Sequence, residues 1–279
     1  MNLYSINTGH FKLDGGAMFG VVPKSIWQKT NPADDNNMCS WAMRCLLIQD
    51  GKRLILIDNG MGNKQDAKFF GYYFLHGNDT LDLSLAKHGF HRDDITDVFL
   101  THLHFDHCGG SIEYNDDRSK LTPAFKNATY WCNQKHWDWA INPNPREKAS
   151  FLKENMLPIK ESGQLQFLTS TTEFITNIAL YEANGHTEAM MLPLISYKNT
   201  TVAFLADLIP SAGHLPLPYV MGYDVRPLNT LKEKEYILKT AAENNWTLFF
   251  EHDLSIECCT VIQTEKGIKL NQSFLLSEL

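Results

Sequence analysis

A short stretch of the chain concentrates side chains that bind metal ions. The sequence THLHFDHCGG, residues 101–110, places His102, His104, Asp106 and His107 within six consecutive positions. Imidazole nitrogen and carboxylate oxygen are ligands that Zn²⁺ and similar divalent ions prefer. In an extended segment His102 and His104 point to the same side, because side chains alternate with a period of two. The pattern therefore predicts a metal-binding loop, and a His-rich polar turn is the weaker interpretation.

Three further candidate ligands follow at wider spacing. His186 lies in ANGHTEAM, Asp207 in FLADLIP and His252 in FFEHD. Each of these residues follows a short apolar run that predicts a buried strand. Strand ends are rigid positions that can hold ligands while loops shape a pocket above them. We therefore expect these three side chains to converge with the first cluster.

The seven side chains are sufficient for two ions. A catalytic zinc ion takes about three protein ligands and keeps one position open for water. The first ion is assigned three histidines, His102, His104 and His186. The second ion is assigned Asp106, His107 and His252. Asp207 is expected to bridge the two ions, which lie ~3.5–4 Å apart in two-metal sites.

Two such ions predict hydrolytic chemistry. A water molecule held between them loses a proton near neutral pH, so no serine or cysteine nucleophile is needed. We expect the resulting hydroxide to attack an ester-like carbonyl or phosphoryl centre, with Asp106 and Asp207 also handling protons. The expected cofactors are two divalent metal ions per chain, zinc first, with Mn²⁺, Fe²⁺ and Co²⁺ as open alternatives.

Short apolar runs are mixed with amphipathic ones along the chain, which indicates sheets covered by helices. The predicted strands are residues 41–49, 53–58, 97–102, 128–132, 178–183, 201–207 and 247–252. The predicted helices are residues 82–89, 133–141, 145–161 and 228–245. No low-complexity or linker-like segment interrupts the pattern, so we expect one domain over residues 1–279.

The motif HLHFDH, followed in order by one His, one Asp and one His, resembles the metallo-β-lactamase-fold hydrolase superfamily. The resemblance covers most of the chain. It implies an α+β four-layer αββα sandwich, in which two mixed sheets pack face to face with helices outside. The run RLILIDNGMG resembles the family's early strand that ends in Asp. It implies that Asp58 orients elements of the metal site, although an Asp at a strand–turn junction can also simply cap a turn.

The gaps from His107 to the later ligands are most similar to those of the N-acyl-homoserine-lactone lactonases and the methyl parathion hydrolase-like enzymes. This likeness implies a hydrolase of lactones, esters or phosphotriesters. Two positions depart from the family pattern. Pro210 stands where the lactonases usually carry a tyrosine, and Ala189 replaces the last Gly of the family's GHTxG. Only 27 residues follow His252, so we expect no helical C-terminal domain of the glyoxalase II kind.

Two alternative functions stay open at this level. The same two ions could serve a phosphodiesterase or a thioesterase. A redox or metal-binding scaffold is disfavoured, because family members that carry iron and pass electrons usually have Glu at the position of His104 and an attached flavin domain. Two zinc ions per chain together with hydrolysis of aryl esters and lactones would separate the first function from the scaffold. Phosphodiester turnover above both would favour the second.

Two Gly/Pro-punctuated segments, residues 15–27 and 211–224, are candidates for the substrate pocket. The first resembles the mobile N-terminal loop that covers the site in this branch of the family. The candidate pocket residues are Phe19, Trp27, His214, Tyr219 and Tyr223. Simple core packing is the alternative. If these residues line a cleft, the expected partner is a small, partly apolar, ester-like substrate.

The composition excludes other classes of partner. The net charge of −7 and the absence of a basic block argue against nucleic acid and anionic membranes. No apolar run approaches the roughly 18 residues of a membrane span, and the N-terminus lacks a secretory pattern. The six cysteines lack CxxC spacing and are interpreted as thiols of a cytoplasmic protein. A homodimer stays open. Histidines outside the motifs are interpreted as ordinary residues: His10, His76, His88, His91 and His136.

Overall fold

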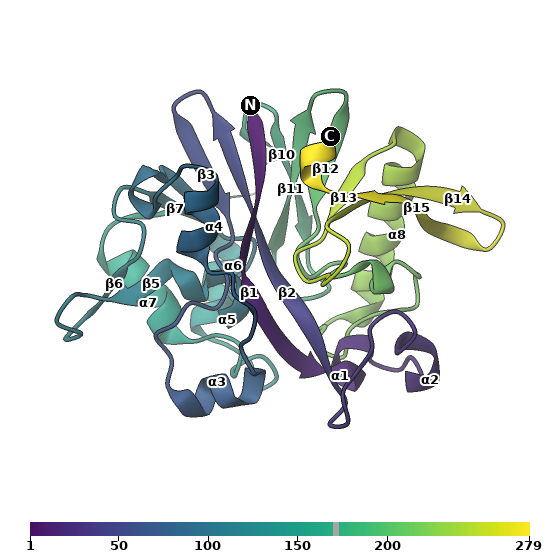
Figure 1. Ribbon diagram of the computed structural model, residues 1–279, viewed down its shortest axis with the longest axis horizontal. Helices are drawn as coiled ribbons and strands as arrows, with labels where there is room; N and C mark the ends of the chain where they lie inside the picture. The colour runs from purple at the N-terminus through teal and green to yellow at the C-terminus, as the bar shows by residue number, and fades with distance from the viewer. Residues whose placement is uncertain (170–172) are drawn as a thin grey trace. The chain divides into compact units, whose positions relative to one another are not determined.

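The computed structural model describes residues 1–169 and 173–279 (Figure 1). The described part of the chain divides into two compact units. Of the described residues, unit 1 comprises 1–9 and 43–169, and unit 2 comprises 10–42 and 173–279. The two long strands β1 (Asn2–Asp14) and β2 (Met38–Asp50) contribute residues to both units. The prediction of one domain over residues 1–279 stays a prediction.

Unit 1 is built on a mixed sheet with the strand order β1-β2-β3-β4-β7-β8. The remaining strands of the unit are β3 (Arg53–Ile57), β4 (Asp97–Phe99), β5 (Ile112–Tyr114), β6 (Leu121–Pro123), β7 (Thr129–Asn133) and β8 (Leu165–Leu168). Its helices are α3 (Ala67–Tyr73), α4 (Leu81–Lys87), α5 (Phe105–Cys108), α6 (Gln134–Ile141) and α7 (Lys153–Glu161). Single-turn 3₁₀ helices are η1 (Arg92–Asp94) and η2 (Gly109–Ser111).

The centre of this sheet is parallel. Strands β3, β4, β7 and β8 run in the same direction, with Ile57 opposite Phe99 and Phe99 opposite Trp131. Parallel strands are buried on both faces, which explains the unbroken apolar run LILI in β3. One apolar cluster joins these strands to the helices and includes Leu56, Val98 and Trp137. The carboxyl ends of neighbouring parallel strands therefore meet at one rigid edge.

Unit 2 is built on a second mixed sheet with the order β15-β14-β13-β12-β11-β10-β9. Its strands are β9 (Glu173–Ile175), β10 (Ile178–Ala183), β11 (Met190–Tyr197), β12 (Thr200–Phe204), β13 (Thr247–Phe249), β14 (Cys258–Thr264) and β15 (Gly267–Phe274). Its helices are α1 (Gly15–Phe19), α2 (Lys24–Trp27) and α8 (Pro227–Asn244). Its 3₁₀ turns are η3 (Ala212–His214) and η4 (Leu276–Glu278).

Helix α8 is the long helix of unit 2 and connects the parallel strands β12 and β13 (Figure 1). Proline at its first position fits the helix start, where a missing N–H costs nothing. Asn245 ends it in the left-handed conformation at φ 52°. Its buried face includes Ile237, Leu238 and Ala241, and the helix packs against β14 and β15. A helical crossover of this kind is what a parallel strand pair requires.

Several predicted elements differ from the structure. The predicted helix at residues 145–161 begins only at Lys153, because the preceding residues form turns. The strands predicted to end at residues 102, 207 and 252 end at Phe99, Phe204 and Phe249, three residues earlier. Strand β11 was not predicted, since Pro193 interrupts its apolar pattern. Among the described residues, no helix combines the length and apolarity that crossing a membrane requires.

Candidate functional site

The first cluster consists of His102, His104, Asp106 and His107 and follows the carboxyl end of a parallel strand in unit 1. Asp58 directly follows β3, and Thr101 and His102 follow β4. The Asp58 amide donates to the Phe99 carbonyl at 2.9 Å, which continues the ladder beyond the last paired residues. Asp58 has φ 55°, a left-handed conformation that costs a non-glycine residue about 1 kcal/mol. This turn directs the Asp58 carboxylate toward the neighbouring strand end.

The Asp58 carboxylate connects two parts of the cluster. It accepts hydrogen bonds from the Thr101 amide at 2.8 Å and from the Thr101 hydroxyl at 2.6 Å. Its Oδ2 also lies 3.1 Å from Nδ1 of His107. A carboxylate can only accept, so His107 donates its Nδ1–H, and Nε2 is the nitrogen that could bind a metal ion. Nε2 of His107 lies 3.9 Å from Oδ2 of Asp106.

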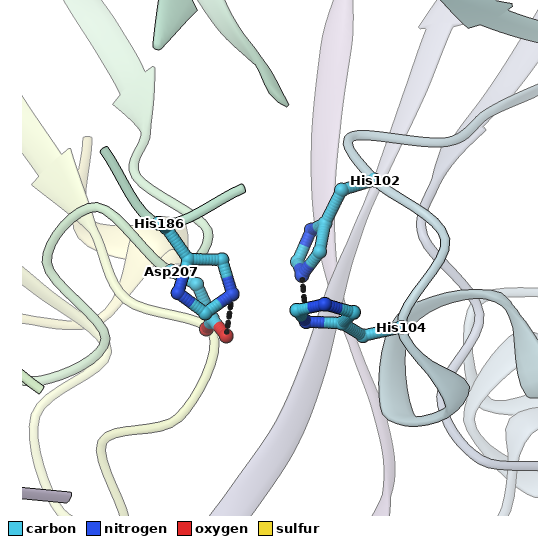
Figure 2. Close-up of side chains that lie close together, drawn as sticks. All are labelled: His102, His104, His186 and Asp207. Carbon is cyan, nitrogen blue, oxygen red and sulfur yellow. Dashed lines mark hydrogen bonds and ion pairs between the residues drawn. The ribbon is translucent and has the colours of Figure 1, made fainter. Parts of the chain in front are cut away.

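His102 and His104 approach each other through their ring nitrogens, with Nε2 of His102 3.1 Å from Nδ1 of His104 (Figure 2). The Thr101 hydroxyl proton is used by Asp58, so its oxygen accepts from Nδ1 of His102 at 3.1 Å. This assignment leaves the Nε2 lone pair of His102 directed at His104. Two histidine nitrogens that converge in this way are arranged as two ligands of one cation.

Residues outside the motif hold this loop in place. Nε2 of His136, in α6, accepts the Leu103 amide at 2.8 Å, and both residues are buried. The ammonium group of Lys64 donates to the Gly109 carbonyl. His136 is therefore a core residue that binds the backbone of the metal-motif loop. Its place in a predicted helix did not indicate this role. Lys64 was also missed, because it lies in a loop far from the motif in sequence.

The small residues after the motif are required by close backbone approach. A Cβ on Gly109 would lie 2.1 Å from the Met61 carbonyl oxygen, and one on Gly110 would lie 2.2 Å from the Asn59 carbonyl oxygen. Only glycine fits at such distances. The adjacent Cys108 is fully buried, and burial raises the pKa of its thiol to about 12. Cys108 is thus a protonated core thiol near neutral pH.

The second cluster consists of His186, Asp207 and His252 and lies entirely in unit 2. The register of two strands brings Asp207 and His252 together. Phe204 and Phe249 are partners in the parallel pair β12–β13, and each ends its strand. Asp207 and His252 both lie three residues beyond these ends, which brings them together. Oδ1 of Asp207 lies 3.0 Å from Nε2 of His252, and Oδ2 lies 3.1 Å from Nε2 of His186 (Figure 2 shows the pair with His186). One carboxylate oxygen faces each imidazole.

The remaining ring nitrogens of these two histidines are already engaged. Nδ1 of His186 lies 2.9 Å from Oδ1 of Asp224, and Nδ1 of His252 donates to the Ala42 carbonyl at 2.7 Å. The His252 amide also donates to the Pro210 carbonyl at 3.1 Å. Each imidazole therefore presents Nε2 toward Asp207. A lone pair and a carboxylate oxygen at this distance repel each other unless a proton or a metal ion lies between them.

Two carboxylates flank His186 and control the protonation of its imidazole. Burial alone would lower the pKa of His186, but the carboxylates of Asp207 and Asp224 outweigh it and raise that pKa to about 10. In the metal-free protein a proton thus occupies the position that a cation would take. The donor set of nitrogens and carboxylate oxygens fits a divalent ion of the zinc type. Asp224 was not identified from the sequence.

Two left-handed alanines lie beside the second cluster. Ala206 has φ 41° and directly precedes Asp207, and Ala189 has φ 50°. The amide of Ala189 donates to Oδ1 of Asn184 at 2.9 Å, which closes the turn around His186. The loop thus keeps a conformation that favours glycine although it carries alanine. Strained backbone of this kind often accompanies functional sites.

The predicted pocket residues are packed together in unit 2. Phe19 stacks on His214 at 4.3 Å between ring centroids and on Trp27 at 5.2 Å. All three are buried, Tyr219 is half-buried against Phe19, and Tyr223 is exposed. Residues 15–27 contain the two short helices α1 and α2, joined by a turn. The contact of these residues with a substrate stays a prediction.

Polar contacts fix the segment that follows the second cluster. Nε2 of His214 donates to the Met18 carbonyl at 2.9 Å, and its Nδ1 lies 2.8 Å from the Ser211 hydroxyl. Burial lowers the pKa of His214 to about 3, so the imidazole is neutral. The buried amine of Lys234, in α8, contacts the carbonyls of His214 at 2.8 Å and Tyr219 at 2.7 Å. The segment from residue 211 to 219 is therefore held by buried side chains.

The sequence profile of the metallo-β-lactamase superfamily matches residues 44–252, about three quarters of the chain. The chain belongs to the metallo-β-lactamase superfamily. It has the metallo-β-lactamase fold, an α+β sandwich of mixed sheets with helices, and it is a hydrolase of this superfamily. The matched region contains the candidate ligands from His102 to His252.

Individual members of the superfamily resemble the whole chain. An N-acyl homoserine lactonase from Bacillus cereus is 23% identical over 98% of both chains. The structure of a probable metal-dependent hydrolase from Staphylococcus aureus is similar with a TM-score of 0.89 and 27% identity, covering 98% of this chain and 96% of that one. AidC, a dizinc quorum-quenching lactonase in complex with its product, is similar with a TM-score of 0.78 and 22% identity, covering 98% and 95%.

Proposed function

We propose that this protein hydrolyses ester-like bonds with two divalent metal ions, zinc first, held by both clusters. One ion would be held by His102, His104 and His186. The other would be held by Asp106, His107 and His252, with Asp207 as the ligand shared between them. Lactones are the substrate class that we place first, because relatives that match nearly the whole chain are named N-acyl homoserine lactonases.

The arrangement of Asp207 carries this proposal. Its two oxygens face two different imidazoles at 3.0 and 3.1 Å, and the bonds made by each Nδ1 orient each Nε2 inward. A carboxylate that offers one oxygen to each of two metal ligands is placed to share itself between two ions. Capping a turn would not require an aspartate to lie between two imidazoles with one oxygen near each.

The bound ions would supply Lewis acidity and activation of water near neutral pH. The chain itself has to orient the substrate and move protons. Asp106 and Asp207 are the carboxylates of the two clusters, and we assign them the protons released and returned during hydrolysis. Pro210 brings no hydroxyl group to this edge, and its carbonyl accepts the His252 amide.

An aromatic surface in unit 1 suits the apolar part of an ester-like substrate. Phe105 lies between His104 and Asp106, and its ring contacts Tyr73 at 4.5 Å and Phe69 at 5.3 Å between centroids. Phe105 itself is buried, whereas Phe69 and Tyr73 of helix α3 are half-buried and leave part of their rings at the surface. An acyl chain could cover this surface and gain about 25 cal/mol per Å² of apolar area removed from water. We therefore place the acyl group of the substrate against Phe69 and Tyr73, the partly exposed rings that contact Phe105.

The test combines metal analysis with a substrate panel. The purified protein, loaded with Zn²⁺, Mn²⁺ or Co²⁺, is analysed for bound metal and assayed with N-acyl homoserine lactones, aryl esters, phosphotriesters and phosphodiesters. We expect two ions per chain and the highest kcat/KM with a lactone. One ion or none would overturn the dinuclear assignment, and a preference for phosphodiesters would overturn the substrate class.

The bridging role of Asp207 predicts a coupled loss. Replacing it by asparagine (Asp207→Asn) keeps its size but removes the charge that two ions share. We expect the bound metal to fall below two ions per chain and kcat/KM to fall about 100-fold or more, because losing even an outer partner of a metal site costs 10–100-fold. Metal analysis and lactone hydrolysis measure both effects. The control Asp35→Asn, at an exposed position, should change neither, and a fully active Asp207→Asn protein would reject the bridge.

A further inference from the structure

The turn segment between α6 and α7, residues 142–152, directs a carboxylate into the interior of unit 1. Oδ1 of Asn144 accepts the amides of Arg146 at 2.9 Å and Glu147 at 3.2 Å. The Ser150 amide donates to the Glu147 carbonyl at 2.8 Å. Because of these turns the Glu147 side chain points inward and is only 3% exposed. In a regular helix over 145–161 its direction would be set by the helix face instead.

The Glu147 carboxylate is fixed on one side by neutral donors. Its Oε2 accepts the indole N–H of Trp139 at 2.8 Å and the side-chain amide of Asn144. Trp139 lies in α6, the helix that also carries His136. Two donors on one oxygen hold the carboxylate plane in place. The other oxygen, Oε1, is therefore held in a defined direction.

The same segment supports the first metal-binding cluster. The Ser150 carbonyl accepts the Phe105 amide at 3.1 Å, and the Phe151 ring lies 4.8 Å from the ring of His104. Oε1 of Glu147 lies 3.8 Å from Nε2 of His104, within ion-pair distance but too far for a hydrogen bond. The opposite nitrogen of His104, Nδ1, is the one that faces His102. Glu147 thus lies behind His104 as seen from the proposed ion.

The other four candidate histidine ligands each have an oxygen atom beside one ring nitrogen, as His104 has Glu147. Each places its ring nitrogen away from the proposed ion next to an oxygen: His102 next to Thr101, His107 next to Asp58, His186 next to Asp224 and His252 next to the Ala42 carbonyl. Such partners orient a metal-binding imidazole and make its other nitrogen a stronger donor. His104 has Glu147 in the corresponding place.

We infer that Glu147 is the positioning residue of His104: it orients the imidazole and, through its negative charge, strengthens Nδ1 as a metal ligand. The inference rests on the proposed dinuclear function. It extends that function to a residue outside the HLHFDH motif. A bound cation would make the imidazole more positive, which would strengthen the attraction between its Nε2–H and the Glu147 carboxylate.

Two substitutions separate charge from anchoring. Glu147→Gln keeps the length of the side chain and an oxygen that can accept from Trp139, but removes the charge. Glu147→Asp keeps the charge but shortens the reach to Trp139. Glu161→Gln, at the exposed end of α7, is the matched control for loss of one negative charge. Zn²⁺ affinity is measured by chelator competition, and the Co²⁺-loaded proteins are compared by absorption spectrum.

We expect Glu147→Gln to bind one of the two ions about 10-fold or more weakly and to change the Co²⁺ spectrum, with Glu147→Asp in between and Glu161→Gln unchanged. Circular dichroism and thermal unfolding check that each variant is folded. If Glu147→Gln binds both ions like the wild type while Glu147→Asp does not, Glu147 is an anchor only and the inference fails. A wild-type protein that binds no metal would instead overturn the proposed function.

Discussion

His186 lies between the carboxylates of Asp207 and Asp224, and this environment has a measurable consequence. With a pKa near 10 its imidazole is protonated at pH 7.5 in the metal-free protein. A metal ion can bind only to the deprotonated nitrogen, so binding must release that proton. In the metal-free protein the raised pKa stabilises the fold fully below pH 6.5, and this contribution is lost as the pH rises toward 10. Stability therefore decreases with rising pH in this range, as expected for a histidine paired with carboxylates.

We therefore expect Zn²⁺ binding at pH 7.5 to release at least about one proton per chain. Calorimetric titration in buffers of different ionisation enthalpy measures the number. Asp224→Asn removes one of the two flanking charges and lowers the pKa of His186, so fewer protons should be released at pH 8.5. Exposed Asp35→Asn serves as the control. Equal proton release by wild type and Asp224→Asn would show that Asp224 does not set the charge of His186.

The candidate ligands were identifiable from sequence because they share a compact motif or follow apolar strand runs. Their partners were not. Asp224, Glu147 and His136 lie in segments whose direction depends on turns and packing elsewhere in the chain. The side chain of Glu147 points inward only because residues 142–152 are not helical. A local pattern shows which residues can bind a metal, whereas tertiary contacts decide which residues stand behind them.

At the level of elements, the turn before His186 depends on close packing against α8. The Asn184 and Gly185 amides donate to the carboxylate of Glu233 at 2.8 and 3.0 Å, and the Gly185 carbonyl accepts the Arg226 amide. A Cβ on Gly185 would lie 2.4 Å from the backbone nitrogen of Thr230. Backbone cannot move aside as a flexible side chain can. The helix would have to shift.

Gly185→Ala should consequently lower the free energy of unfolding by about 1–3 kcal/mol, as overpacking does, and weaken metal binding through His186. Gly71→Ala is the matched control, because a Cβ there meets no atom within 4 Å in the exposed helix α3. That control should raise the free energy of unfolding by about 0.5–1 kcal/mol. Urea denaturation measures both. A neutral Gly185→Ala variant would show that α8 does not hold this turn.

The secondary structure was predictable where patterns are local and uninterrupted, as in β3, α4, α6 and α8. The ends of β4, β12 and β13 were predicted three residues too late. In each case the apolar run continues into the loop that carries the ligand, since that loop is itself buried. The apolar residues of a buried loop beside a polar site therefore resemble the apolar run of a strand in the sequence. The ladder of hydrogen bonds, which ends earlier, is not visible in residue types.

For the whole molecule, the proposed ligand set predicts how far the effect of metal removal extends. Ions that bind the folded state but not the unfolded chain stabilise it by RT ln(1 + [L]/Kd), about 4 kcal/mol at a thousandfold excess over Kd. Because the proposed ligands come from unit 1 and from unit 2, chelation should raise amide hydrogen exchange both at residues 101–110 and around His186, Asp207 and His252. The hairpin β14–β15 carries none of these ligands and is the internal control. Mass-spectrometric exchange of the zinc-loaded and chelated protein measures this, and a response confined to one unit would mean that the ions take their ligands from that unit alone.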